Sequence, residues 1–320
     1  MINSWAQDRN CPFPTDQVPH LTAAWEFSRQ RLQQLRTALQ QNPVSPHVAC
    51  VAVSGSLSRM ESHTGSDIDL LVVVDDRDGD PGPAVREQIY ADTWSIVAAA
   101  LENRPPRPKP GGIFSQTASW KQLTDAGVRG RVDEPITPYG QRMQLLLDAQ
   151  PVSGHETFAQ LQGELLQWSS DPAIVAVFAD AGPFHWLTQE IHRYWHSIRA
   201  RACWLHADEP HKAIHVNVKL RSSRLLLIRT FLTAIQQCHQ REGTAADRRH
   251  ALAMGCRQVP LERLSDQLCG EDLLTMLTDY ESAWLFTQHN PPGTTTVPAN
   301  VRAALRRLQH GMATLDQRPE

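Results

Sequence analysis

Apolar residues follow two kinds of pattern along the chain: long stretches at helical spacing, and two short runs that are nearly continuous. Between Leu21 and Leu39 apolar residues recur three or four positions apart until Pro43 ends the pattern, which predicts a leading helix. Val48–Ser54 is a short β-rich run, and Ile68–Val74 is an apolar run typical of a strand covered on both faces. The pattern therefore predicts a helix followed by two strands, with a polar, glycine-containing connection between the strands.

The rest of the first half continues to mix helix and strand patterns. Ala84–Leu101 has the spacing of an amphipathic helix, which the proline-rich segment Arg104–Gly112 ends. Gly111–Thr117 is the candidate for a third strand. A Thr-Pro pair at residues 137–138 is typical of a helix start, and we expect that helix to end before Pro151.

From about residue 156 helical patterns dominate, and we expect no further strand. The helix candidates are Pro183–Leu205, Val216–Gln237, Leu261–Leu268, Leu273–Phe286 and Asn300–Leu315. We therefore predict an α+β fold in three parts: an N-terminal helical segment at 1–46, a unit with a mixed sheet at 47–155, and a C-terminal helical domain at 156–320.

The composition is that of an ordinary globular protein. The 320 residues are 41% hydrophobic and 20% charged, with 31 basic against 34 acidic residues and a formal net charge of −3. This balance argues against a protein that coats nucleic acid non-specifically. No apolar run approaches the roughly 20 residues that cross a bilayer. The first residues lack the apolar segment of a secretory signal, and the six cysteines are widely spaced. We therefore expect a cytoplasmic protein with reduced cysteines and no membrane contact.

The residues that indicate chemistry lie between the two predicted strands and at the start of the second. Gly55 and Ser56 form a turn in which backbone N–H groups can approach an anion, because glycine has no Cβ. Asp67 and Asp69 are two residues apart on a strand, so their side chains point to the same face. Like charges this close repel unless a cation lies between them, which favours a Mg²⁺ site. Either element alone is common on solvated loops, but here the aspartates flank Ile68 in a strongly apolar strand.

This arrangement resembles the signature of the DNA polymerase β-like nucleotidyltransferase superfamily. The motif is most similar to bacterial PII-uridylyltransferase-type nucleotidyltransferase domains, and the matching residues are Gly55, Arg59, Glu61, Ser66, Asp67, Ile68, Asp69 and Leu70. Residues 145–154 resemble the helix that follows the catalytic sheet in those enzymes. The resemblance covers about residues 48–155, and it implies a mixed catalytic sheet with a helical domain after it.

The resemblance also implies a reaction. Asp67 and Asp69 would be catalytic and would hold Mg²⁺, or Mn²⁺, against the triphosphate of an NTP such as ATP. Gly55 and Ser56 would donate hydrogen bonds to the β and γ phosphates. An acceptor hydroxyl would attack the α-phosphorus in line and displace pyrophosphate, a reaction that needs positioning and charge neutralisation more than covalent help.

Further residues of the motif have less defined roles. Ser66 belongs to the expected nucleotide-binding set, and Arg59 either approaches the triphosphate or fixes the loop through an ion pair with Glu61. Many superfamily members carry a third carboxylate on a later strand, and Gly111–Thr117 contains none. The candidates for this third carboxylate are Asp133, Glu134 and Asp148.

Residues 185–229 contain eight basic and three acidic residues, a local balance of +5 in a chain of −3. Lys219, Arg221 and Arg224 fall within about two turns of a predicted helix and can reach a common anion. We expect them to clamp the triphosphate or to contact a nucleic-acid acceptor, and the alternative is a solvated helix face.

The motif leaves the acceptor open. A protein Tyr or Ser side chain, an RNA 3′ end and a small molecule such as an antibiotic all supply a hydroxyl. A second hypothesis, favoured by the missing third carboxylate, is a catalytically silent nucleotide-binding regulator or an antitoxin-like partner of a toxin–antitoxin pair.

Overall fold

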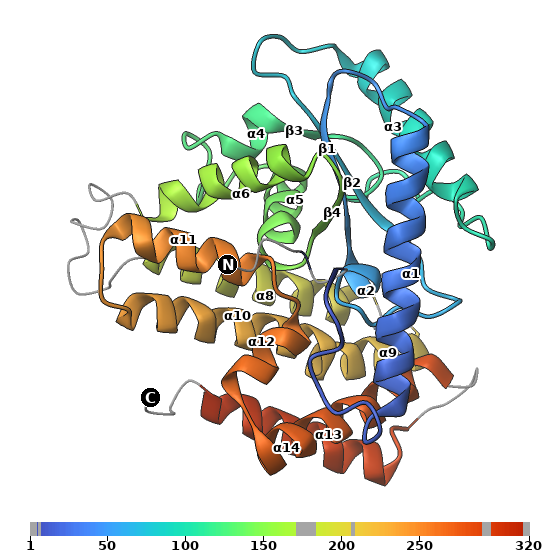
Figure 1. The fold of residues 1–320 in the computed structure, drawn as a ribbon, viewed down its shortest axis with the longest axis vertical. Helices are drawn as coiled ribbons and strands as arrows, with labels where there is room; N and C mark the ends of the chain where they lie inside the picture. The colour runs from blue at the N-terminus through green and yellow to red at the C-terminus, as the bar shows by residue number, and fades with distance from the viewer. Residues whose placement is uncertain (1–4, 6–7, 171–183, 206–208, 290–295, 316–320) are drawn as a thin grey trace.

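The computed structural model describes residues 5, 8–170, 184–205, 209–289 and 296–315, which form a small sheet surrounded by helices (Figure 1). The strands are β1 (Val48–Ser54), β2 (Asp69–Val74), β3 (Ala118–Ser119) and β4 (Gln150–Ser153). Their order is β3-β2-β1-β4; β1 is antiparallel to β2 and β4, and β2 is parallel to β3. The predicted α+β fold, with a mixed sheet and a helical C-terminal region, is thus confirmed.

Helices precede, interrupt and follow the sheet. The first five are α1 (Pro19–Gln41), α2 (Gly55–Ser58), α3 (Pro83–Ala99), α4 (Trp120–Thr124) and α5 (Ile136–Leu147). The later helices are α6 (His155–Ser169), α8 (His185–Leu205), α9 (Pro210–Arg221), α10 (Ser223–Gln240), α11 (Ala245–Cys256), α12 (Pro260–Gln267), α13 (Gly270–His289) and α14 (Ala299–Leu315). Among the described residues, none of these helices has the length and apolar character needed to cross a bilayer.

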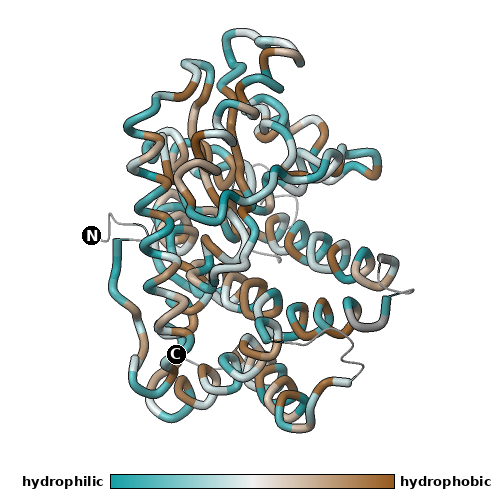
Figure 2. Tube along the Cα trace, turned by 90° about the vertical axis from the view of Figure 1, so that its right-hand side faces the viewer, coloured by the Kyte–Doolittle hydropathy of each residue, from teal (hydrophilic) through white to brown (hydrophobic). Residues whose placement is uncertain are grey.

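The two faces of the sheet divide the hydrophobic core into two clusters. Val51, Val53 and Val72 belong to a cluster with α1, α3, α13 and α14. Ala52 and Val73 point the other way, into a cluster with α5, α6, α8 and α10. Apolar and polar positions alternate along the surrounding helices (Figure 2), as expected for helices with one buried side. Helices from both ends of the chain therefore cover the sheet. The division of the chain into three parts, at residues 46 and 155, stays a proposal.

Several predicted elements of the first half are confirmed. β1 has the predicted bounds, and β2 begins at Asp69, one residue later than expected. The helices α1, α3 and α5 lie where the apolar spacing predicted them, with ends that differ by a few residues.

The predicted third strand at Gly111–Thr117 is wrong. The segment consists of turns and bends, in which Gly111 has a φ of +89° and the Ser115 N–H donates to the Gly112 carbonyl at 3.2 Å. A segment closed by such a local bond cannot extend along β2. The two residues of β3, directly after it, pair with β2 instead.

Residues 145–154, which resemble a helix of the related enzymes, are helical only as far as Leu147, and the prediction that this helix ends before Pro151 is confirmed. α5 ends at Leu147, and β4 then pairs with β1. Pro151 has no N–H to donate to a helix, so the chain extends after α5. Gly154 ends the strand with a φ of +67°, and a Cβ there would collide with the Ala49 carbonyl.

In the second half, the helix predicted at Val216–Gln237 is two helices. Ser222 leaves the helical conformation (φ −118°, ψ −95°) between α9 and α10, and its hydroxyl donates to the Val218 carbonyl at 2.8 Å. The helices α6 and α11 were not predicted. α11 begins with a capping box at Thr244 and Asp247, a local signal that the sequence contains.

Candidate active site

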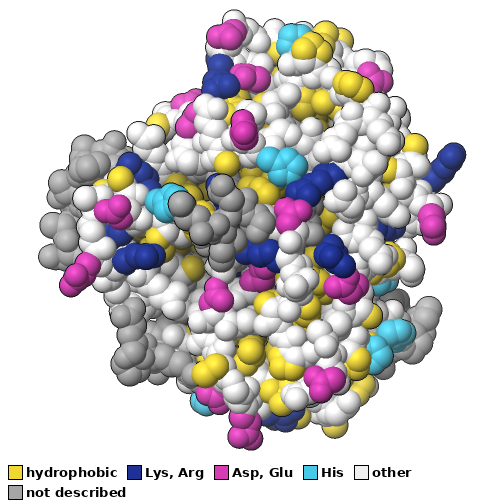
Figure 3. Space-filling view, viewed as in Figure 1, with side chains coloured by type: hydrophobic (Ala, Val, Ile, Leu, Met, Phe, Trp, Pro, Cys, Tyr) yellow, Lys and Arg dark blue, Asp and Glu magenta, His cyan; other side chains and the backbone are white. Residues whose placement is uncertain are grey.

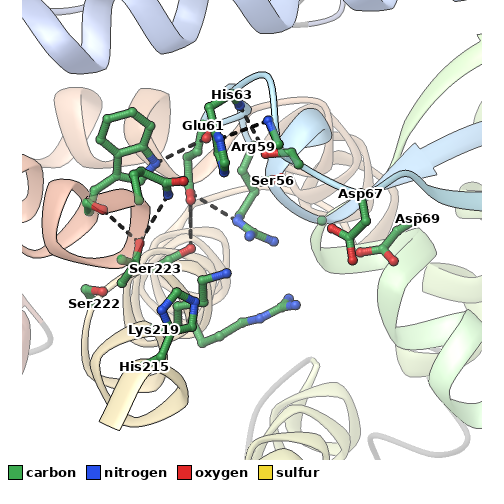
Figure 4. Close-up of a pocket in the computed structure, with 17 residues that line it drawn as sticks. Ser56, Arg59, Glu61, His63, Asp67, Asp69, His215, Lys219, Ser222 and Ser223 are labelled. Atoms are coloured by element: carbon green, nitrogen blue, oxygen red, sulfur yellow. Dashed lines mark hydrogen bonds and ion pairs between the residues drawn. The ribbon is translucent and has the colours of Figure 1, made fainter. Parts of the chain in front are cut away.

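The pairing of β1 with β2 brings the Gly-Ser turn and the two aspartates together. Ser54, the last residue of β1, is opposite Asp69, the first residue of β2. Asp67 precedes the strand, and its carboxylate lies beside that of Asp69 (Figure 4). Gly55 follows Ser54 with a φ of +76°, and a Cβ at this position would collide with Asp69 Oδ2. The close approach of turn and acid therefore requires glycine.

A cavity of about 500 Å³ lies between this turn and residues of α9, α10 and α13. Eight of the nine predicted site residues line it: Gly55, Ser56, Arg59, Ser66, Asp67, Asp69, Lys219 and Arg224. The cavity thus brings the sequence motif and two cations of the helical region to one place.

Arg221, the ninth predicted residue, does not line this cavity. Its guanidinium donates to Gln309 Oε1 on α14 at 2.7 and 3.2 Å. Lys219 and Arg221 are two residues apart on α9 and so point to different sides of it, and the break at Ser222 separates both from Arg224 on α10. Arg221 therefore takes no part in the pair of cations that lines the cavity with the aspartates.

The negative charges of Asp67 and Asp69 are not compensated by hydrogen bonds from the described residues. Within the described residues neither carboxylate accepts a hydrogen bond, although Asp67 is exposed and Asp69 is partly buried. Burial, followed by the charge of Asp67, raises the pKa of Asp69 to about 6, against a smaller opposing effect of Arg224. The two acids thus form a negative centre that a cation would stabilise.

The donor set fits a small divalent cation. Carboxylate oxygens are hard ligands, and Mg²⁺ is commonly held by one or two carboxylates together with substrate phosphates and water. In the part of the chain that the structure describes, no third His, Cys, Asp or Glu joins the pair in a metal-ligating cluster. The remaining ligands of such an ion would therefore have to be phosphate oxygens and water.

Asp148, one of the three candidates for a third carboxylate, lies next to this site, but its oxygens are already bonded. It accepts from Arg59 Nη1 at 2.7 Å, Ser58 Oγ at 3.0 Å and the backbone N–H of Gly55 at 3.3 Å. Arg224 Nη1 is 3.4 Å away. A carboxylate held by two guanidiniums is not free to bind a metal. The Gly55 N–H, which was predicted to donate to a phosphate, donates to Asp148 here.

The other two candidates for a third carboxylate do not line the cavity. Asp133 is exposed and pairs with Arg131 at 2.9 Å. Glu134 accepts hydrogen bonds from Arg142, at 2.7 Å, and from Arg193. Neither carboxylate is placed to act with Asp67 and Asp69.

Arg59 and Glu61 fix the connection after α2 to the helical region. Arg59 Nε donates to Glu61 Oε1 at 3.0 Å, which confirms the predicted ion pair. Ser223 Oγ donates to Glu61 Oε2 at 2.9 Å, and Trp284 Nε1 donates to the Glu61 carbonyl at 3.1 Å. The shape of the turn therefore depends on α10 and α13 as well as on the motif.

Ser66 shapes the loop that leads to the aspartates. It is buried, and its Oγ accepts the backbone N–H of His63 at 3.0 Å. The His63 Nδ1 in turn accepts the N–H of Gly65 at 3.1 Å. These bonds hold the loop in position before Asp67, and the role of Ser66 in nucleotide binding stays a proposal.

Sequence reasoning did not assign part of the cavity wall to the site. The additional residues are Glu61, His63, Gly65, His215, Ser222, Ser223, Trp284, Thr287 and Gln288. Trp284 is 223 residues from its partner Glu61, so no local pattern could connect the two. His215 is spaced four residues from His211 like a metal-ligand pair, but among the described residues it belongs to no metal-ligating cluster.

Comparison with known proteins agrees with this geometry. Residues 32–104 match the family model described as a nucleotidyltransferase domain, a range that includes β1, α2, β2, α3 and both aspartates. No curated protein and no solved structure matched the chain. The similarity to PII-uridylyltransferase-type domains therefore stays a prediction. The family match and the site together support a nucleotidyltransferase domain of the polymerase β-like superfamily in this part of the chain.

Proposed function

We propose that the protein transfers a nucleoside monophosphate from an NTP to a hydroxyl acceptor, using Mg²⁺ bound by Asp67 and Asp69 and releasing pyrophosphate. One observation carries this proposal: two carboxylates without hydrogen-bond donors among the described residues line the same cavity as Lys219 and Arg224. Acids and cations lining one cavity suit a triphosphate that a metal ion bridges to the acids. The family match over residues 32–104 supports the same class of reaction.

The residues of the chain would divide the work between them. Asp67 and Asp69 hold the cation, which when bound neutralises phosphate charge and makes the α-phosphorus more open to attack. Ser56 donates its hydroxyl to the triphosphate, and Lys219 and Arg224 stabilise the charge that develops on the leaving pyrophosphate. The bond from the acceptor oxygen to the α-phosphorus forms as the bond from this phosphorus to the oxygen that bridges to the β-phosphate breaks. The bridging oxygen leaves with pyrophosphate, and the proton of the acceptor hydroxyl passes to water.

The acceptor class in this proposal is a protein side chain or an RNA 3′ end. The reaction consumes an NTP, so we propose the cytoplasm as its location. A catalytically silent regulator is not favoured, because two uncompensated carboxylates beside each other repel, and a protein without a cation at this site gains nothing from them.

Incubation of the protein with each of four α-labelled NTPs, Mg²⁺ and candidate acceptors tests the proposal. We expect transfer of label and release of pyrophosphate that depend on Mg²⁺. Separation of labelled protein from labelled RNA then identifies the acceptor class. Full transfer by a variant that carries both Asp67→Ala and Asp69→Ala would end the proposal.

A further inference from the structure

A row of cavities continues from the candidate active site along one side of α1. A second cavity of about 450 Å³ shares His63, Trp284 and Gln288 with the first. A third, of about 180 Å³, shares Phe27 and Thr64 with the second. Because neighbouring cavities have wall residues in common, the three adjoin in a row that begins at the cavity with the aspartates, and we name the second and third cavities the α1 groove.

One face of α1 forms the floor of this groove. The α1 residues that line the second and third cavities are His20, Ala23, Ala24, Phe27, Gln30, Arg31 and Gln34. They recur at the three- and four-residue spacing of a single helical face. With a rise of about 1.5 Å per residue, this face is about 20 Å long, which an extended peptide of roughly six residues would span.

Arg31, in the third cavity, is a buried cation that forms no ion pair among the described residues, although the charge of Glu102 in the same cavity acts on it from a distance. The residue is 6% exposed, its Nη2 donates to Asn103 Oδ1 at 2.8 Å, and its guanidinium lies 5.0 Å from the centre of the Phe27 ring. Within the described residues it forms no ion pair, and its Nη1 has no hydrogen-bond partner. In contrast, the buried Arg59 and Arg142 each pair with two carboxylates. A buried guanidinium that bonds to no carboxylate of its own chain favours an external carboxylate or phosphate.

We propose that the α1 groove binds a peptide segment of a protein acceptor, and that Arg31 pairs with an Asp or Glu side chain of that segment. This inference rests on the proposed function, because the segment would present its hydroxyl to the cavity that contains Asp67 and Asp69. The apolar walls supplied by Phe27, Trp284 and Leu285 suit the side chains between the acid and the hydroxyl.

The charges along the groove favour a peptide over other acceptors. An RNA strand carries a phosphate at every nucleotide and is normally bound by several Lys or Arg residues, whereas the residues lining the second and third cavities include Arg31 as their single Lys or Arg. On the face of the molecule shown in Figure 3, basic side chains are interspersed with acidic ones and form no continuous basic patch. A polycationic small molecule would need several acids, and among these lining residues Glu102 is the single carboxylate.

The test uses two peptide libraries, one with a central Tyr and one with a central Ser, each with six randomised positions on either side. A random RNA dodecamer with a free 3′ hydroxyl is the competing acceptor. Each is incubated with the full chain, labelled NTPs and Mg²⁺, and labelled peptides are sequenced. We expect Asp or Glu to be enriched about tenfold at a position within six residues of the hydroxyl, the size of effect that a charge-assisted pair gives.

Variants of α1 identify the residue that selects Asp or Glu in the peptide. Arg31→Gln should abolish the enrichment, Arg31→Lys should reduce it, and Arg29→Gln should leave it unchanged, because Arg29 is on α1 but outside the groove and pairs with Glu26. A variant that is merely less stable labels all peptides less and keeps the ratio between them. If Arg31→Gln does not fold, a selected peptide with its acid changed to the amide should show a raised KM with little change in kcat.

The outcomes separate this inference from the proposed function. Labelling of RNA alone, pyrophosphate release without labelled peptide, labelled peptides without acid enrichment, or enrichment that survives Arg31→Gln would each overturn the inference while the proposed function stands. No transfer to any acceptor and no pyrophosphate release from the wild type would overturn both.

Discussion

Two pairs of acidic side chains lie at the candidate active site, and the structure holds them in opposite ways. Asp148 and Glu61 are buried, at 7% and 3% exposure, and both pair with Arg59. Asp67 and Asp69 line the cavity, and among the described residues no donor reaches them. The first pair is fully used in holding the turn against the helices. The second pair remains available to a ligand from outside the chain.

The presence or absence of hydrogen-bonding partners thus distinguishes carboxylates with a structural role from those proposed to be catalytic. All four acids are close to the same turn, so position alone does not distinguish them. A buried carboxylate with several donors is needed by its surroundings, because its removal leaves a charge without a partner. A carboxylate without hydrogen-bond donors destabilises the fold around it, and its presence is explained by the binding of a ligand from outside the chain.

The largest expected effect comes from removing the unpaired acids. Asp67→Ala combined with Asp69→Ala should reduce nucleotidyl transfer by about 10³-fold or more, since metal coordination supplies several kcal/mol of transition-state stabilisation. The circular dichroism spectrum and thermal midpoint should not fall, because the change relieves a repulsion. Asp75→Asn, at the other end of β2 and paired with Arg77, is the matched control and should retain activity.

Removing a paired acid should instead damage the fold. Asp148→Ala leaves the buried Arg59 with Glu61 as its remaining acidic partner and should cost about 3–5 kcal/mol of unfolding free energy in urea titrations. Asp133→Ala removes an exposed pair and should leave the urea midpoint almost unchanged. Equal stability of the two variants would contradict the structural role assigned to Asp148.

The sequence predicts only part of this contrast between paired and unpaired carboxylates. The turn and both aspartates could be predicted because they are close together in the chain, between the end of β1 and the start of β2, and the antiparallel pairing of these two strands brings them together. The partner of Asp148 could not be predicted in the same way, because Arg59 is 89 residues away and the contact depends on where α5 ends.

The cations of the helical region show the same limit. Lys219, Arg221 and Arg224 are similar candidates in the sequence, but Arg221 lies on a different side of α9 from Lys219, and the irregular conformation of Ser222 interrupts the helix before Arg224. Serine is common within helices and gives no clear signal for a break there. The sequence did not predict the two short strands β3 and β4 for a related reason. Each is defined by its pairing with β2 or β1 and not by an apolar run of its own.

A smaller effect should distinguish the two neighbouring cations on α9. Lys219→Gln removes a charge from the cavity and should raise the KM for the NTP about tenfold, equivalent to about 1.4 kcal/mol. Arg221→Gln removes a bond to Gln309 outside the cavity and should change this KM less than twofold. Steady-state kinetics under saturating Mg²⁺ checks both, and equal effects would contradict the placement of Lys219 in the cavity and of Arg221 outside it.

The smallest expected effect is a pH dependence of stability. The folded-state pKa of Asp69 is raised to about 6 from an ordinary value of 3.8, so the folded protein binds this proton more tightly than the unfolded chain. The stability that this group contributes is therefore present below about pH 4 and is lost as the pH rises to about 6. Thermal midpoints in EDTA should fall relative to those of Asp69→Asn across this window, and Mg²⁺ should reduce the fall. A difference in thermal midpoint between the wild type and Asp69→Asn that stays constant over this pH range would contradict the prediction.

Metal binding at the unpaired acids is the central claim, and electron paramagnetic resonance of Mn²⁺ tests it most directly. With a non-hydrolysable NTP analogue present, the wild-type chain should convert free Mn²⁺ to a protein-bound signal. The variant with both Asp67→Asn and Asp69→Asn should bind Mn²⁺ at least about tenfold more weakly, because both carboxylate ligands are gone. Equal Mn²⁺ binding by the two proteins would contradict the account.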